Sequence, residues 1–329
     1  MPRLRRVAPD TPGWQRRRSG RGFRYLDEAG AALPAAEVER IKALVIPPAW
    51  EQVWICPDPQ GHLQATGTDA AGRRQYLYHP RWRALRSRQK FVRVAAAAER
   101  LPQVRARVAD DLGATGMPLQ RAAATAVRLL DLGYFRIGSD CYADANGSFG
   151  LTTLERRHVR RHGEGLAFRF VGKSGIEHHV LIEDTGVLEA LRVMRRRPGG
   201  DRLLAHRTGS GWADLSSAAV NAYLAELFGG DFTAKDFRTW HAGVIAAASL
   251  ASSEEPGRTV SSRKRAVRTA VGEVAAYLGN TPAVARSAYI DPRLVEAYEH
   301  GRTIDLAGEY RDAEARQAAL EAAVLDLLA

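Results

Sequence analysis

The chain has 329 residues, 45% of them hydrophobic, so it can bury a core and is long enough for two domains. Its net charge of +11 favours a polyanionic partner, with nucleic acid as the first candidate. Two cysteines, apolar runs no longer than about nine residues and a basic N-terminus argue against a disulfide-stapled secreted domain, a membrane span and a signal peptide. We therefore expect a globular protein of the reduced cytoplasm.

The first 90 residues fall into two parts of different composition. Residues 1–20 are rich in Arg, Pro and Gly without periodicity, which predicts a flexible basic arm. Residues 21–90 contain strand-like runs at 23–26, 52–56, 62–65 and 75–78, separated by Gly, Pro and Asp turns, with one helix at about 35–44. This part is predicted to be a small, mostly β domain.

Residues 91–329 are predicted to form a larger, mainly helical domain, which makes the fold class α+β. Helical periodicity recurs near 91–113, 119–132, 186–196, 216–228, 235–251, 262–278 and 312–329. The exception is 166–182, where two alternating segments flank Gly172-Lys173-Ser174-Gly175 and predict a β-hairpin with a two-residue turn. In the last helix, Leu320 and Val324 are expected to form a docking face.

The basic residues are unevenly divided between the two types. Of 48 Lys and Arg residues, five are Lys and therefore 43 are Arg. GC-rich codons are the simplest explanation of the ratio, yet the few lysines deserve inspection because Lys can transfer a proton and Arg cannot. Lys173 stands at the predicted hairpin tip, where it is either an ordinary exposed lysine or a movable proton donor.

Three further residues suggest phosphate chemistry. Arg136 lies between aromatic and glycine residues after an apolar helix, and Arg238 lies near the start of a helix, where anions bind. Tyr289 follows a run of small residues; a phenol is only ~0.1% ionised at neutral pH, so it attacks only where positive charge surrounds its target. Arginines beside aromatic residues more often pair within the fold, so each of these signals is weak alone.

Together these motifs resemble the type IB DNA topoisomerases, specifically the bacterial and poxvirus-like branch, over roughly residues 20–300. The matching segments, in the family's order, are Gly72-Arg73-Arg74-Gln75-Tyr76-Leu77-Tyr78, Phe135-Arg136-Ile137-Gly138, Val171-Gly172-Lys173-Ser174-Gly175, Lys235-Asp236-Phe237-Arg238-Thr239-Trp240-His241 and Ser287-Ala288-Tyr289-Ile290.

The resemblance implies a C-shaped clamp around double-stranded DNA, in which Tyr289 attacks a backbone phosphate. A 3′-phosphotyrosyl link and a free 5′-hydroxyl form, and strand rotation precedes resealing. Arg136 and Arg238 would hold the non-bridging oxygens, and Lys173 would protonate the departing 5′-oxygen. No cofactor, ATP or metal is expected, since the sequence has no Walker A pattern and no carboxylate cluster at ligand spacing.

Asn280 stands where the family usually has histidine. Its amide can donate a hydrogen bond to a phosphate oxygen but brings no charge, and the alternative is that it merely caps the helix after Gly279. His241, one turn from Arg238, is a conceivable substitute, although a histidine beside Trp240 is more often structural.

The expected DNA-binding residues are carried over from the same resemblance: Arg73, Gln75, Tyr76, Tyr78, Arg86, Tyr142 and Lys235. Alternate side chains of the strand at 75–78 can face one groove. Arg83, Arg86 and Lys90 share a face if their segment is helical, and either contact phosphates or form a solvated surface. A further basic cluster lies at 156–162.

The sequence thus predicts a monomeric enzyme that relaxes supercoiled DNA in the cytoplasm, associated with the nucleoid. A tyrosine site-specific recombinase is one alternative, although such proteins typically place histidine where this chain has Lys235 and have a helical N-terminal part. A non-catalytic DNA-binding protein is the other, and Asn280 keeps it open.

Overall fold

The computed structural model describes residues 3–133, 135–138, 147–230, 232–253 and 259–329. It divides into two compact units, Met1–Lys90 and Phe91–Ala329. No helix among the described residues is both long enough and apolar enough to cross a membrane.

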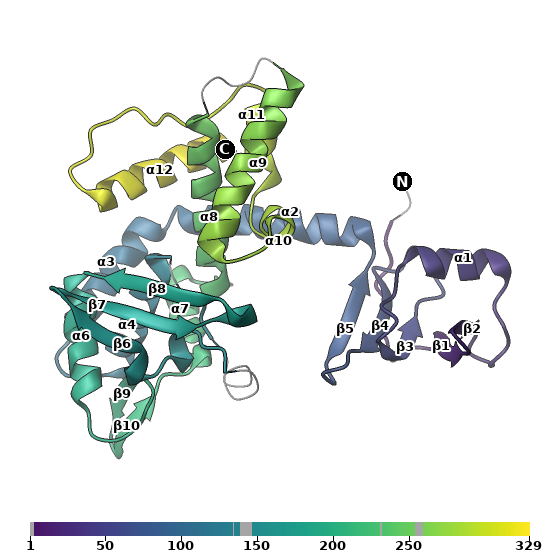
Figure 1. Ribbon diagram of the computed structural model, residues 1–329, viewed down its shortest axis with the longest axis horizontal. Helices are drawn as coiled ribbons and strands as arrows, with labels where there is room; N and C mark the ends of the chain where they lie inside the picture. The colour runs from purple at the N-terminus through teal and green to yellow at the C-terminus, as the bar shows by residue number, and fades with distance from the viewer. Residues whose placement is uncertain (1–2, 134, 139–146, 231, 254–258) are drawn as a thin grey trace. The chain divides into compact units, whose positions relative to one another are not determined.

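The smaller unit is built on one antiparallel five-stranded sheet, in the order β2-β1-β3-β4-β5 (Figure 1). The strands are β1 (Trp14–Ser19), β2 (Gly22–Leu26), β3 (Glu51–Ile55), β4 (Leu63–Thr68) and β5 (Arg74–Tyr78), and the one long connection carries helix α1 (Ala35–Ala43). Ile41 of α1 packs on Val53, Ile55 and Ala65 of the sheet, so one helix covers the apolar face. The mostly β character predicted for 21–90 is confirmed.

The expectation of a flexible arm over residues 1–20 is wrong for its second half. Residues 14–19 form β1, which pairs with β2 from Gln15 to Ser19 and with β3 at Trp14 and Gln15. The guanidinium of Arg16 donates to the carbonyl oxygens of Ile46, Pro47 and Trp50. The Arg-rich composition concealed the strand from the sequence pattern, because this arginine bonds to loop carbonyls instead of solvent.

Helices dominate the larger unit, as predicted. They are α2 (Pro80–Ala98, which begins in the smaller unit), α3 (Leu101–Leu112), α4 (Leu119–Asp131), α6 (Thr185–Arg196), α7 (Ser217–Phe228), α8 (Ala234–Ala251), α9 (Val260–Leu278), α10 (Pro282–Ala288), α11 (Pro292–Glu299) and α12 (Ala313–Leu328). Helix α4 is the centre of the core: its residues 122–127, 129 and 130 are all buried. The short helices α10 and α11 were not predicted.

Two small antiparallel sheets complete this unit. One has the order β6-β7-β8, with β6 (Val159–His162), β7 (Gly165–Val171) and β8 (Glu177–Ile182); the other pairs β9 (Ala205–Thr208) with β10 (Gly211–Asp214). The predicted hairpin is therefore β7-β8, but its turn is not the two-residue one expected. Gly172 N–H bonds to the carbonyl of Ile176 at 2.7 Å and closes a three-residue loop, because the positive φ angles fall on Ser174 and Gly175.

A buried ion-pair cluster fastens the last helix to the core. Arg105 of α3 forms bonds of 2.8 and 2.9 Å to Asp131 of α4 and of 2.7 and 2.9 Å to Glu321 of α12. Both carboxylate side chains are only 6% exposed, and the pKa of Asp131 is lowered because its pairing with Arg105 outweighs the effect of burial. Leu320 and Val324 are buried on the docking face expected of this helix.

Candidate active site

One pocket of the larger unit collects residues from five separate segments. Its volume is about 770 Å³. Arg136, Lys173, Lys235, Arg238 and Tyr289 all line it, and only Lys235 and Arg238 share a segment. The rest of its wall is Ile137, Gly138, Ser148, Phe149, Gly150, Ser174, Gly175 and Ala234.

The segment that carries Arg136 is held by two backbone hydrogen bonds from the short 3-10 turn Leu151–Thr153. Leu151 N–H donates to the carbonyl of Arg136 at 2.7 Å, and Thr152 N–H donates to that of Ile137 at 2.8 Å. A Cβ on Gly150 would lie 2.4 Å from the Cα of Gly138, so the two glycines let these backbones approach. The arginine is thereby fixed on a short, tightly paired stretch after α4.

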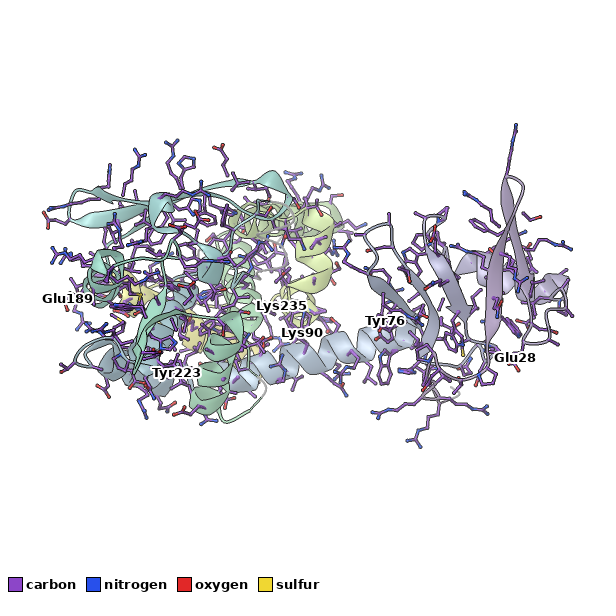
Figure 2. The ribbon with its side chains drawn as sticks, turned by 90° about the horizontal axis from the view of Figure 1, so that it is seen from below. Glu28, Tyr76, Lys90, Glu189, Tyr223 and Lys235 are labelled. Carbon is purple, nitrogen blue, oxygen red and sulfur yellow. The ribbon has the colours of Figure 1, made fainter. Side chains whose placement is uncertain are left out.

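Arg238 is positioned by the start of α8. Asp236 accepts hydrogen bonds from the N–H and hydroxyl of Thr233 at 2.9 and 2.8 Å and closes the N-terminal cap. The same carboxylate receives both terminal nitrogens of Arg93, from α2, at 3.2 and 2.9 Å. Arg238 follows in the second turn and is only 5% exposed, whereas Lys235 (labelled in Figure 2) is exposed in the first turn.

Both arginines bond to the C-terminal turn of α9. The carbonyl of Leu278 accepts from Arg136 Nη2 at 2.9 Å and from Arg238 Nη2 at 2.6 Å, and the carbonyl of Gly279 accepts from Arg136 at 3.2 Å. Gly279 has the left-handed conformation, with φ of 58°, that commonly ends a helix. The last carbonyls of α9, at the negative end of the helix, thus fix two guanidinium groups side by side.

The side chain of Asn280 joins this arrangement. Its Oδ1 accepts from Arg136 Nη2 at 3.1 Å, while its backbone N–H bonds to the carbonyl of Ala275. The backbone therefore takes part in ending α9, as the capping hypothesis expects, and the side chain also faces the arginine. His241 does not join: it is buried among core residues, 4.0 Å from Asp131, and does not line the pocket.

Tyr289 lies between two short helices. Helix α10 begins after the cap residue Thr281 and ends at Tyr289, whose N–H bonds to the carbonyl of Ala285 at 3.0 Å. Asp291 caps α11 immediately afterwards. The tyrosine is 8% exposed, and the centroid of its ring lies 6.0 Å from Cζ of Arg238. Short, well-capped helices on both sides restrict the phenol to the pocket wall.

Three buried N–H donors at the site have no hydrogen-bond acceptor within the described part of the chain: Arg136 Nε, Arg238 Nε and Asn280 Nδ2. Burial, followed by the positive charge of Arg136, lowers the pKa of Arg238 to about 10, so its guanidinium remains charged at neutral pH. Buried donors without partners cost free energy, and an anion that accepts from them removes this cost. The pocket is therefore suited to bind an oxyanion.

The residues expected to bind DNA are distributed over both units. In the smaller unit, Tyr76 and Tyr78 share a face of the edge strand β5 and stack at 6.2 Å, with Tyr76 50% exposed. Gln75 alternates to the other face and, like Arg73, bonds to Asp69.

Two further expected contacts were assigned to other segments. Arg86, on the exposed surface of α2, donates to Gln89 at 3.2 Å. Tyr142 lies outside the described residues.

The basic cluster at 156–162 is partly internal. Arg156 donates to the carbonyls of Arg195, Arg197, Gly199 and Gly200, so it provides hydrogen bonds to a loop and is not a free surface charge.

The sequence interpretation also missed the wall formed by residues 148–150. The only sequence feature that could have indicated this wall is the presence of Gly138 and Gly150. Their close approach is visible only in the fold.

Comparison with known proteins identifies the family of this chain. The model of the catalytic core of eukaryotic DNA topoisomerase I matches residues 79–305, and that of the N-terminal domain of bacterial DNA topoisomerase IB matches residues 22–69. DNA topoisomerase 1B of Acanthamoeba polyphaga mimivirus is 28% identical over 297 residues, which cover 88% of each chain. That of vaccinia virus (strain Copenhagen) is 21% identical over 264 residues, 79% of each chain. Taken with the pocket, these matches show that the chain belongs to the type IB DNA topoisomerases.

Proposed function

We propose that this enzyme relaxes supercoiled DNA by a reversible transesterification at Tyr289. The phenolic oxygen attacks a backbone phosphorus, and the bond from phosphorus to the 5′-oxygen breaks. The phenol proton is lost, the 5′-oxygen gains a proton, and a 3′-phosphotyrosyl bond remains. Because the phosphotyrosyl bond retains the energy of the broken bond, resealing needs neither ATP nor a metal ion.

The pocket that Arg136, Lys173, Arg238 and Tyr289 line together is the observation that carries this proposal. Charge accumulates on the non-bridging oxygens as the fifth bond to phosphorus forms, and preorganised donors stabilise that charge most effectively. The unpartnered Nε groups of Arg136 and Arg238, with Nδ2 of Asn280, are such donors. We assign the two guanidinium groups and the amide to the non-bridging oxygens.

Lys173 is assigned a different task, the protonation of the departing 5′-oxygen. It is exposed at the tip of the β7-β8 hairpin and lines the pocket there, on a different segment from those that carry Arg136 and Arg238. An ammonium group can give up a proton near neutral pH, which a guanidinium does not do. The division of labour between Arg and Lys thus follows from their chemistry.

DNA contacts are proposed for Lys235 at the pocket and for Arg73, Gln75, Tyr76, Tyr78 and Arg86 in the smaller unit, with Tyr142 as a further candidate. The stacked pair of Tyr76, which is exposed, and Tyr78, which is partly buried, supports groove contact by β5. We infer that a monomer closes on double-stranded DNA in the bacterial cytoplasm. If the protein contacts 6 to 10 phosphates, its affinity for DNA should fall by about 10³ to 10⁵-fold as salt rises from 50 to 200 mM. An affinity that does not change with salt would contradict a clamp.

The test is covalent trapping by denaturant on duplex DNA labelled at either end of one strand. We expect the 5′-labelled fragment to become attached to protein and the 3′-labelled fragment to be released with a 5′-hydroxyl. Tyr289→Phe, which removes one oxygen atom, should abolish attachment while it retains DNA binding. Attachment that survives in this variant would exclude Tyr289 as the nucleophile.

Plasmid relaxation separates this function from the two alternatives. We expect wild-type protein to relax supercoiled plasmid without added recognition sites or ATP. A recombinase would need paired sites, and a non-catalytic binding protein would yield no trapped complex.

A further inference from the structure

The side chain of His178 lies beneath the hairpin tip, in contact with two glycines from distant segments. On β8 it is paired with Phe170 of β7, and the two rings stack with centroids 5.0 Å apart. A Cβ on Gly172 would lie 2.7 Å from Cδ2 and Nε2 of the imidazole, and one on Gly279 would lie 3.8 Å from Cε1. The half-buried ring therefore fills the space between these backbones.

Each of the two glycines belongs to a different half of the site. Gly172 directly precedes Lys173, and its N–H and carbonyl form the hydrogen bonds that close the loop, to Ile176 and from Gly175. Gly279 belongs to the α9 turn and accepts from Arg136. Ile176 reinforces the contact, since its Cδ1 would lie 3.6 Å from a Cβ on Gly279. The hairpin tip thus packs on the C-terminal turn of α9, to which both arginines bond, through the side chains of His178 and Ile176.

The surroundings of His178 favour its neutral form. Burial lowers the pKa of the imidazole, and the positive charges of Arg136 and Arg238 lower it further, with a smaller contribution from His179. His179 itself points to the other face of β8, where Arg169 donates to it and Glu177 lies 3.6 Å away. A neutral ring can pack against this turn without repelling the two guanidinium groups.

We propose that His178 is a positioning residue that seats the Lys173 loop on the α9 turn, so that the proton donor is held at a set distance from the two arginines. The inference rests on the proposed function. His178 is not among the residues that line the pocket, so it acts through Lys173 and not on DNA. The glycine at 172 is the counterpart of this contact, because a Cβ there would lie 2.7 Å from the imidazole and would displace the ring or the loop.

The experiment measures single-turnover cleavage by the full-length protein on two otherwise identical duplexes. One has the normal 5′-oxygen leaving group, and the other has sulfur at that position. A thiol has a reference pKa of about 8.5, so a thiolate leaves without the proton that an alkoxide requires. Lys173→Ala provides the reference pattern, a large defect with oxygen and little defect with sulfur.

We expect His178→Ala to slow cleavage of the oxygen substrate by about 10²-fold, the order of loss caused by a small displacement of a catalytic group. The defect should largely disappear with sulfur. His178→Phe retains a ring on Phe170 and should restore most of the rate. His179→Ala, the neighbouring substitution on the opposite face, should cleave both substrates at the wild-type rate.

Three results would overturn the inference: a wild-type rate for His178→Ala with oxygen, a His178→Ala defect that persists with sulfur, or a His178→Phe rate as low as that of His178→Ala. DNA affinity and thermal unfolding of each variant identify a protein that has not folded, and His178→Phe then decides the question. If wild-type protein forms no Tyr289-dependent covalent complex, the proposed function fails as well; normal wild-type cleavage beside an unaffected His178→Ala defeats the inference alone.

Discussion

The two sides of the pocket are constructed differently. On one side, Arg136 and Arg238 are tied to the carbonyls of Leu278 and Gly279 by hydrogen bonds of 2.6–3.2 Å, and Arg238 is buried. On the other, Lys173 is exposed on a three-residue loop between two strands. A rigid guanidinium pair suits the stabilisation of charge at a fixed phosphorus, whereas an exposed ammonium at a loop tip can reach a leaving group and give it a proton.

The largest effect is expected from the removal of Lys173, on the loop side of the pocket. Lys173→Ala should slow cleavage by about 10² to 10⁴-fold, the usual contribution of general acid catalysis, with DNA affinity almost unchanged. Lys173→Arg keeps the charge but not the ability to give up a proton, so it should not recover the rate. Single-turnover cleavage and equilibrium binding measure the two quantities, and a fully active Lys173→Arg would refute the acid role.

The rigid side should respond somewhat less. Arg238→Ala removes a preorganised donor pair and should slow cleavage by about 10² to 10³-fold. Arg238→Lys should recover little, because lysine lacks the planar fork that binds two oxygens. The same cleavage assay applies, with sulfur at the leaving group as the contrast: the Arg238→Ala defect should persist there, and its disappearance would assign the arginine to leaving-group departure instead.

Asn280 should contribute less than either side. Its amide is a neutral donor held by Arg136, so Asn280→Ala should slow cleavage by about 2- to 10-fold, the value of one ordinary hydrogen bond. Asn280→Asp, of nearly equal size, replaces the donor by a negative charge and should slow the reaction more. A greater loss for Asn280→Ala than for Arg238→Ala would reverse our assignment of the clamp.

The smallest effect concerns the contact between the two sides. The pKa of His178 is lowered in the folded protein by burial and by Arg136, Arg238 and His179. The unfolded chain therefore takes up this proton first, and the stability of wild-type protein should fall as pH drops below about 6.5. His178→Phe lacks this group, so the difference in unfolding free energy should shift in its favour on acidification. A difference independent of pH between 7.5 and 5.5 would contradict the prediction.

Much of the fold follows from periodicity in the sequence. Amphipathic segments such as α4 and α6, and alternating segments such as β7 and β8, bury enough surface for local pattern to determine their structure. Helices α10 and α11 have only seven and eight residues, too few for a pattern, and depend on the caps Thr281 and Asp291. The β9-β10 hairpin was missed for the same reason of length.

The site was less accessible to sequence reasoning. Motif order predicted Arg136, Lys173, Arg238 and Tyr289 as site residues, and the fold brings them to one pocket, but nothing local indicates that one carbonyl, that of Leu278, would hold both arginines. The role of Asn280 was open between cap and ligand, and its backbone and side chain divide these contacts. His178 could be assigned to a face of β8 by alternation, yet its neighbour Gly279 lies about a hundred residues away and only the fold brings them together.

The buried cluster of Arg105, Asp131 and Glu321 has a mechanical consequence. In the proposed reaction, Tyr289 is bonded to DNA while the other end of the broken strand swivels, so torque acts on the segment that carries the tyrosine. Helix α12 follows that segment and is anchored by Glu321, which accepts two hydrogen bonds from Arg105 of α3. Two further hydrogen bonds tie the same arginine to Asp131 of α4. The load on the covalent link is thus transmitted to the core, and helix α12 keeps the segment that carries Tyr289 attached to it.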